Sequence, residues 1–397
     1  MEKKKKIGLV PKLLFAILAG ILLGLYAPET LNRMFVTAAD IFRVFLMFII
    51  PLMVLAFVAS GIANLTHGAG KLLGITVILA YGSTLLAGSC AFMVADALFP
   101  QFITPSVMEA VGDPQEGMLS PYFTVPLTPV LSVTSAIVLA FVLGVCISAM
   151  RARQGGDVLY GFVQELTSVI TMVLHTVIIP LLPFYICGVF VNMTVSGQTF
   201  AVLHILWKVF LTVIVVHLAY LAFLFTVGGI AGKKNPLRLM RNQIPGYLTA
   251  VGTQSSAATI PVNLECAKEN CVSEQIRNFV VPLCATIHMA GSMITITCCV
   301  TSVLLLYTLP VGFGVILPFI LTLGVAMVAA PGAPGGAIMS TLPFLPLVGI
   351  APDGAMAALL IALYIIQDSF GTACNVSGDN AIAVMVDAFY EKKIKSA

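Results

Sequence analysis

Residues 278–352 contain no Asp, Glu, Lys or Arg, but they include eight prolines and the cluster Pro331-Gly332-Ala333-Pro334-Gly335-Gly336. One membrane-spanning helix needs about 20 apolar residues, so this stretch is too long for a single span. Proline removes a backbone donor and glycine weakens a helix by about 1 kcal/mol, so the helix must be interrupted. In lipid, interrupted backbone survives only inside protein or beside a cavity. The stretch therefore predicts a broken segment enclosed within a membrane protein.

The composition of the whole chain supports this assignment. Of its 397 residues, 59% are hydrophobic and only 9% are charged, whereas soluble domains carry about 25% charged residues. The net charge is +3, and the basic residues gather at the ends of apolar segments, which is typical of membrane topology and not of a nucleic-acid surface. The nine cysteines include no pair with metal-ligand spacing, so we expect them to be reduced and buried. We expect an all-α membrane protein in contact with a lipid bilayer and with no nucleic-acid partner.

The apolar segments predict eight transmembrane helices, and six of them precede residue 233. These six are residues 13–27, 45–62, 72–95, 131–150, a fifth within 167–207 that breaks near 192–197, and 209–232. When spans are counted from a cytoplasmic N-terminus, five basic clusters fall on one side and the acidic segment 109–116 falls on the other. The clusters are residues 3–6, 71, 151–153, 233–241 and 392–395. We predict a multi-pass protein of the cell (inner) membrane with both termini cytoplasmic.

A second interrupted segment, residues 252–261, precedes the Gly/Pro cluster. Two interrupted hydrophobic segments in corresponding positions indicate the binding site of a secondary transporter. We therefore predict two re-entrant helical hairpins, at about 240–268 and 313–345, each followed by a full helix, at about 277–307 and 354–389. The first tip offers the hydroxyls of Thr253, Ser255, Ser256 and Thr259, while the second offers mainly backbone. Hydroxyls and free amides at helix ends suit a carboxylate ligand.

The last predicted helix carries a polar stripe. Asp368, Thr372, Asn375 and Asp379 are spaced four, three and four residues apart, so they share one helix face. A charged side chain at the centre of a membrane helix costs about 2.5–3.5 kcal/mol, so we expect a compensating ligand. Carboxylate and amide oxygens suit a hard cation such as sodium, and a carboxylate also suits an ammonium group. A stripe of interhelical hydrogen bonds and a proton relay are the alternatives.

At these residues the sequence resembles the dicarboxylate/amino acid:cation symporter family. The motifs are Ser-Ser-Ala-Ala-Thr-Ile-Pro-Val-Asn at 255–263, His-Met-Ala-Gly-Ser at 288–292, Pro-Gly-Gly-Ala-Ile-Met at 334–339 and Asn-Val-Ser-Gly-Asp at 375–379. They occur in the family's order and cover residues 240–390. Within the family the sequence is most similar to the bacterial serine/threonine–sodium symporters, which share the alanine at position 290.

The resemblance implies a homotrimer in which a transport domain moves as an elevator against a static scaffold. Its domain division places scaffold helices one and two in residues 1–71 and the third helix, on the transport side, in 72–99. Scaffold helices four and five, with helix six, fall in 100–232. The core transport domain, with both hairpins and helices seven and eight, falls in 233–397.

The resemblance also implies two groups of binding residues. The substrate-binding residues are Gln254, Ser255, Ser256, Ser292, Ala333, Gly336, Asp368, Gly371, Thr372 and Asn375, with the ammonium on Asp368 and the carboxylate near Ser256, Asn375 and Gly336. The sodium ligands are Cys284, Thr286, His288, Met289, Asn375 and Asp379, largely through backbone oxygens. Together they provide for one or two sodium ions.

Departures from the family pattern indicate the substrate. Acidic-substrate members place an arginine three residues after the ammonium-binding aspartate, where this chain has Gly371, and commonly another where it has Gln254. A buried side-chain carboxylate on the substrate would then lack a cationic partner, at high cost. We therefore predict a small neutral amino acid, similar to serine, threonine or alanine. We also expect Gly371 to leave room in the pocket.

Other departures concern the coupling ion. Ala290 and Leu85 remove ligands from one buried sodium site of the acidic-substrate carriers, and His288 stands where the family has asparagine. His288 is either neutral, supplying only its backbone oxygen, or a protonatable group that couples protons. We predict a sodium-coupled symporter. The alternatives are a proton-coupled or exchange-type carrier, an acidic amino-acid carrier and an ion channel. No G-x-S-x-G surrounds Ser256, so we do not expect an enzyme.

Overall fold

The computed structural model describes residues 9–65, 71–104, 119–153, 155–197, 199–327 and 335–393. All regular structure in these ranges is helical, which confirms the predicted all-α class. Six helical stretches in the described part are long and apolar enough to cross a membrane: Glu29–Met53, Leu72–Gln101, Asp157–Val195, Leu206–Gly232, Glu274–Leu306 and Ala355–Tyr390. They indicate a multi-pass membrane protein. The full set of eight spans with two re-entrant hairpins stays a prediction.

The N-terminal helices lie close to the predicted segments. They are α1 (Leu9–Tyr26), α2 (Glu29–Leu65), α3 (Lys71–Leu98), α5 (Val133–Arg151), α6 (Asp157–Val173), α7 (Ile179–Val195) and α8 (Thr199–Gly232). A π-helical segment, η2 (Leu174–Ile178), joins α6 to α7. The predicted break near 192–197 is confirmed, because α7 ends at Val195 and Gly197 has a φ of 82°.

Helix α2 begins well before the predicted residue 45. Its early part carries Glu29, Arg33, Asp40 and Arg43, which lower the local hydropathy without opposing helix formation. The charge of Arg43 is matched by Asp40, whose Oδ1 lies 2.6 Å from Nη2. Hydropathy therefore located the apolar part of this helix and not its start.

The C-terminal part contains α9 (Pro236–Thr253), α10 (Ser256–Glu269), α11 (Glu274–Ile287), α12 (Ala290–Leu306), α13 (Phe313–Met327), α14 (Gly336–Thr341), the 3-10 segment η3 (Leu342–Val348) and α15 (Ala355–Lys393). The single helix that we predicted over 277–307 is wrong in one respect. It divides at His288 and Met289, whose φ/ψ angles of −107°/105° and −122°/38° are not helical. The sequence signal for one span is apolarity, which a short break does not alter.

Helices α9 and α10 pack against each other and meet at Gln254 and Ser255, in the middle of the predicted first hairpin. Gln254 adopts a left-handed conformation with φ 52°. The Ser255 side chain caps α10 by accepting a hydrogen bond from the Ala258 amide, at 3.3 Å. In the second predicted hairpin, α13 packs against α14 and η3, and the intervening residues 328–334 lie outside the described part.

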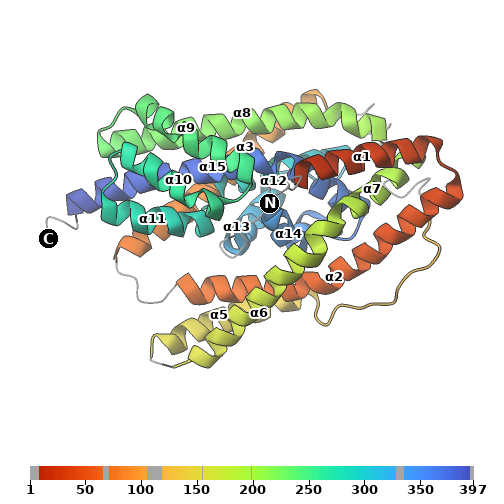
Figure 1. The fold of residues 1–397 in the computed structure, drawn as a ribbon, viewed down its shortest axis with the longest axis horizontal. Coiled ribbons are helices and arrows are strands. Elements are labelled where there is room, and N and C mark those ends of the chain that lie inside the picture. Colours follow the sequence, from red (N-terminus) through yellow and green to blue (C-terminus); the bar gives the residue numbers. More distant parts are fainter. Residues whose placement is uncertain are drawn as a thin grey trace, which may run out of the picture.

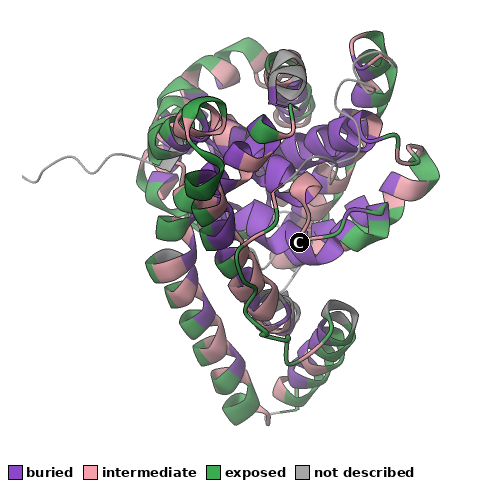
Figure 2. Ribbon diagram, turned by 90° about the vertical axis from the view of Figure 1, so that its right-hand side faces the viewer, coloured by how far each residue is buried: buried purple, intermediate pink, exposed green. Residues whose placement is uncertain are grey.

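The helices form two groups that pack mainly within themselves. Helices α1, α2, α5, α6 and α7 contact one another, whereas α15 packs against α8, α9, α11 and α12 (Figure 1). Buried residues concentrate on the inner helices, and exposed ones on the outer helices (Figure 2). Nearly every residue of α12 is buried. The outer helices expose large apolar side chains such as Phe15, Val158 and Ile230, which a bilayer would cover. The candidate site therefore lies on the most enclosed pair, α12 and α15.

Candidate functional site

The carboxylate of Asp368 lies at the centre of the candidate site. Its side chain belongs to α15 and the residue is only 4% exposed. Oδ1 accepts a hydrogen bond from the Tyr364 hydroxyl at 2.8 Å, and Oδ2 accepts one from the Gly335 amide at 2.7 Å. Among the described residues, no lysine, arginine or histidine forms an ion pair with it. A buried carboxylate with donors but no cation is suited to a cationic ligand.

The second predicted hairpin tip contacts this carboxylate, and the first contacts the neighbouring residue, Ser369. In the first, Gln254 donates from Nε2 to the Ser369 hydroxyl on α15 at 2.8 Å, and Ser256 is buried at the start of α10. In the second, the Gly335 amide donates to Asp368. Gly335 has a φ of 76°, a conformation that favours glycine because glycine has no Cβ. Gly336, the first residue of α14, is also buried. The predicted residue Ala333 lies outside the described part.

Asn375 joins α15 to the start of α12. Its Oδ1 accepts hydrogen bonds from the amides of Gly291, at 2.7 Å, and Ser292, at 3.2 Å. These amides belong to the first turn of α12, where backbone donors have no partner within the helix. Its Nδ2 donates to the Ser292 hydroxyl at 2.9 Å. Asn375 thus positions the start of α12, and its Nδ2 has a second acceptor in the Met289 sulfur at 3.7 Å. Thr372 is buried one turn closer to Asp368.

The room that we expected beside Gly371 is absent. A Cβ at Gly371 would lie 3.3 Å from the Thr295 hydroxyl and 3.6 Å from the backbone of Gly291. A Cβ at Gly291 would in turn lie 2.5 Å from the Cβ of Cys374. Small residues allow membrane helices to approach closely. Because α12 and α15 do so here, the space that a larger residue would occupy is filled by the opposite helix.

The second buried carboxylate, Asp379, contacts a histidine. Its Oδ1 lies 2.9 Å from His288 Nδ1, while Oδ2 has no hydrogen-bond partner among the described residues. The other ring nitrogen of His288 lies 3.0 Å from the Ser83 hydroxyl on α3. The Tyr220 hydroxyl on α8 lies 2.9 Å from that hydroxyl and donates to the Ser83 carbonyl at 2.6 Å. The His288 ring therefore joins Asp379 to α3 and α8, and the choice between a neutral and a protonatable histidine stays a prediction.

Helix α11 ends at Ile287, where the last backbone carbonyls lack partners within the helix, and the next residue, His288, contacts Asp379. The predicted ligand Cys284 uses its carbonyl to accept the His288 amide at 2.8 Å. The Met289 amide donates to the Thr84 hydroxyl at 3.3 Å, whereas Thr286 has an exposed side chain. The described residues include no cluster of three or more His, Cys, Asp or Glu side chains that could hold a metal ion. The unpaired Asp379 oxygen and nearby carbonyls fit a hard monovalent cation better than a transition metal.

A buried amide network fixes the first hairpin to α15. Asn263 on α10 donates to the Val376 carbonyl at 2.9 Å and accepts from Gln243 on α9 at 3.0 Å. Gln243 also accepts from Asn380 on α15. A fully paired polar network inside the protein rigidifies the elements that it joins. The hydrogen bonds of Gln243 and Asn263 therefore hold α9 and α10 against α15, and this keeps the tip of the hairpin beside the site.

Sequence reasoning missed three residues of this arrangement. Tyr364 lies four residues before Asp368, so its place on the same helix face could have been found from spacing. Ser83 and Tyr220 gave no such signal, because both are far from His288 in the sequence: Ser83 on α3 contacts the His288 ring, and Tyr220 on α8 contacts Ser83.

Comparison with known proteins gives one family and a group of relatives. Residues 9–389 match the model of the sodium:dicarboxylate symporter family. The chain is 26% identical to the serine/threonine transporter SstT of Acinetobacter baylyi over 397 residues, which cover 96% of this chain and 97% of that protein. It is 27% identical to SstT of Acinetobacter baumannii over 405 residues, 98% of each chain. The motif order at 255–263, 288–292, 334–339 and 375–379 indicated the same family.

Proposed function

Because this chain belongs to the sodium:dicarboxylate symporter family, we propose that it is a secondary symporter that carries a small neutral amino acid, similar to serine, threonine or alanine, together with sodium. The names of the relatives from Acinetobacter baylyi and Acinetobacter baumannii, serine/threonine transporters, support an amino-acid substrate. We place the protein in the cell (inner) membrane with both termini in the cytoplasm.

The observation that carries this proposal is the environment of Asp368. Its buried carboxylate has two hydrogen-bond donors but no ion-pair partner among the described residues, so it suits the ammonium group of an amino acid. Ser256 and the amides at the hairpin tips are the groups that bind the substrate carboxylate. From residue 278 to residue 391 the sequence contains no lysine or arginine. A second carboxylate on the substrate would therefore have no cationic partner, which favours a neutral side chain.

The second buried carboxylate accounts for coupling to sodium. Asp379 Oδ2 lacks a partner in the described part, and in our proposal one sodium ion binds there with carbonyls at the α11–α12 break. A second sodium ion uses backbone oxygens near Thr286, Met289 and the second hairpin. Because binding linkage is reciprocal, sodium at Asp379 raises substrate affinity and substrate raises sodium affinity.

We further propose that the helices move as two bodies in a homotrimer, with an elevator-type transport domain of residues 72–99 and 233–397 and a scaffold in residues 1–71 and 100–232. The exception within residues 100–232 is helix six, which corresponds to α8: it packs along α15, so we assign it to the moving side and not to the scaffold. In the described part of the chain, one ion pair links the two groups: Arg43 Nη1 on α2 lies 2.9 Å from Asp353 Oδ2, just before α15.

Uptake into proteoliposomes tests the proposal. Labelled alanine, serine, threonine, aspartate and glutamate are each supplied with and without an inward sodium gradient, at several pH values. We expect accumulation of neutral amino acids that requires sodium. Uptake that follows the proton gradient and ignores sodium would instead favour a proton-coupled carrier, the alternative that the His288–Asp379 contact supports. Preferential uptake of aspartate or glutamate would refute the neutral-substrate proposal.

A further inference from the structure

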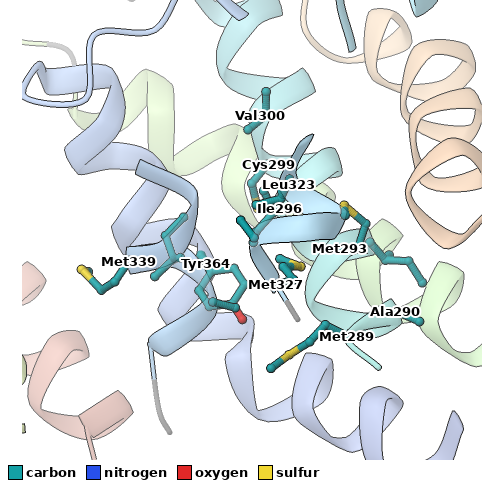
Figure 3. Close-up of a cluster of buried hydrophobic side chains, with 14 of the residues drawn as sticks. Met289, Ala290, Met293, Ile296, Cys299, Val300, Leu323, Met327, Met339 and Tyr364 are labelled. Atoms are coloured by element: carbon teal, nitrogen blue, oxygen red, sulfur yellow. The ribbon is translucent and has the colours of Figure 1, made fainter. Parts of the chain in front are cut away.

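Tyr364 connects the Asp368 carboxylate to the start of α12. The residue is fully buried in α15. Its ring lies in an apolar cluster with Met327 and Met339, and its hydroxyl is directed to the side of the view on which Met289 lies (Figure 3). The hydroxyl oxygen lies 2.8 Å from Asp368 Oδ1 and 3.1 Å from the Ser292 hydroxyl. The ring fixes the position of the hydroxyl, because packed side chains leave it little rotational freedom.

The hydrogen bonds in this connection have a fixed direction. A tyrosine hydroxyl has one proton and two acceptor lone pairs. The proton goes to the Asp368 carboxylate, because that contact is shorter and a bond to an ionised acceptor is stronger. The contact between Tyr364 and Ser292 is then a bond that Ser292 donates. Ser292 itself accepts from Asn375 Nδ2 at 2.9 Å. The chain of donors therefore runs from Asn375 through Ser292 and Tyr364 to Asp368.

We propose that Tyr364, together with Ser292, recognises a hydroxyl group on the substrate side chain. This inference rests on the proposed function, because it requires an amino acid whose ammonium binds Asp368. In serine and threonine, the carbon that carries the hydroxyl is bonded to the carbon that carries the ammonium. An ammonium on Asp368 therefore brings the hydroxyl next to the group that contacts Asp368 Oδ1, which is Tyr364.

A hydroxyl can enter this chain without changing its direction. It accepts the proton of Ser292 and donates its own proton to the Tyr364 oxygen, which continues to donate to Asp368. The methyl group of alanine cannot form hydrogen bonds, so the direct hydrogen bond between Ser292 and Tyr364 stays in place and alanine binds without the additional hydrogen bonds. A carboxylate has no proton to donate to Tyr364, and it would lie beside the negative charge of Asp368. The order of preference is therefore serine and threonine first, alanine second, and aspartate last.

The ratio of the KM values for alanine and serine measures this recognition, because a general loss of transport cancels in it. Tyr364→Phe removes only the hydroxyl, and we expect the preference for serine over alanine to fall on the order of tenfold. Ser292→Ala, which leaves the ring and Asp368 in place, should lower it in the same direction. Because the two groups act as one chain, the double variant should lose little more than either single variant. Serine- and alanine-induced thermal stabilisation of the purified protein provides a second readout.

Tyr307→Phe is the matched control. Tyr307 is a buried tyrosine at the end of α12 whose hydroxyl has no hydrogen-bond partner in the described part of the chain, so this variant should keep the wild-type ratio. If Tyr364→Phe keeps the wild-type ratio of KM values, the inference is overturned and the proposed function remains intact. If Tyr364→Phe does not fold, Ser292→Ala decides instead, and a wild-type ratio in that variant has the same consequence. Wild-type protein that accumulates no amino acid at all overturns the proposed function and this inference together.

Discussion

Replacement of Asp368 by asparagine changes the charge of the site with almost no change in volume. In the wild type, Oδ1 and Oδ2 accept from the Tyr364 hydroxyl and the Gly335 amide, at 2.8 Å and 2.7 Å. An asparagine retains one acceptor oxygen and presents a donor in place of the other. If the amide oxygen faces Gly335, the Tyr364 hydroxyl must turn to accept from the amide and donate to Ser292. In the other orientation the Gly335 amide is an unpaired buried donor, which costs about 1–3 kcal/mol. Removal of an unpaired buried charge offsets part of this cost, so we expect Asp368→Asn to fold.

The loss of substrate affinity should be much larger than the change in stability. Truncation of one partner of a buried, hydrogen-bonded charge pair costs about 2–5 kcal/mol. At about 1.4 kcal/mol per factor of ten, this corresponds to a roughly 30- to 4,000-fold weaker Kd. Calorimetric titration of the purified variant with serine, at saturating sodium, measures the change, and the melting temperature without substrate reports folding. If folded Asp368→Asn binds serine within about threefold of the wild-type Kd, the assignment of the ammonium to Asp368 is wrong.

Three further predictions concern the ion, the link between the helix groups and the α12–α15 contact. Asp379→Asn should raise the sodium concentration for half-maximal serine binding by at least about tenfold, and an unchanged sodium titration would remove Asp379 from the ion site. Asp353→Asn, which breaks the partly exposed pair with Arg43, should change the uptake rate by up to about fivefold while the Kd stays the same; an altered Kd with an unaltered rate would contradict this. Gly291→Ala should destabilise the protein by about 1–3 kcal/mol, as measured by thermal unfolding. Gly82→Ala on α3 is the control and should not destabilise it, because a Cβ there meets nothing within 4 Å. Equal melting temperatures for the two variants would contradict the close contact between α12 and α15.

The sequence predicted the helical class and the approximate position of most helices, because the apolar segments and the basic clusters are long-range averages over many residues. It predicted the start of α2 poorly, since Asp40 and Arg43 reduce the hydropathy of a segment that is still helical. It also missed the division between α11 and α12. The backbone at His288 and Met289 departs from the helix without any proline or glycine at the break itself, so local propensity gives no signal there.

The site was predicted as well as local spacing allows. Asp368 and Asn375 belong to one helix, and their common face follows from the helical period. Gln254 hydrogen-bonds Ser369, the residue next to Asp368, and the family resemblance was what suggested that the first tip lies there. The partners of His288 are different, because Ser83 and Asp379 come from two other helices, and Ser83 is in turn held by Tyr220 from a third. A histidine at this position is uninformative until the fold places a carboxylate beside it.

Gly371 illustrates why a missing side chain does not predict a cavity. From the sequence, a glycine where related carriers have arginine leaves volume for the substrate. The structure instead brings α12 close to α15 at this residue, with Gly291 opposite it and the Thr295 hydroxyl 3.3 Å from where a Cβ would lie. Close packing favours such an approach, because a void loses the contacts of every atom around it. An arginine at 371 would have to separate the two helices before it could pair with an acidic substrate. The proposal of a neutral substrate therefore has two physical grounds: residues 278–391 contain no lysine or arginine, and the space that an arginine at 371 would occupy is filled by the opposite helix.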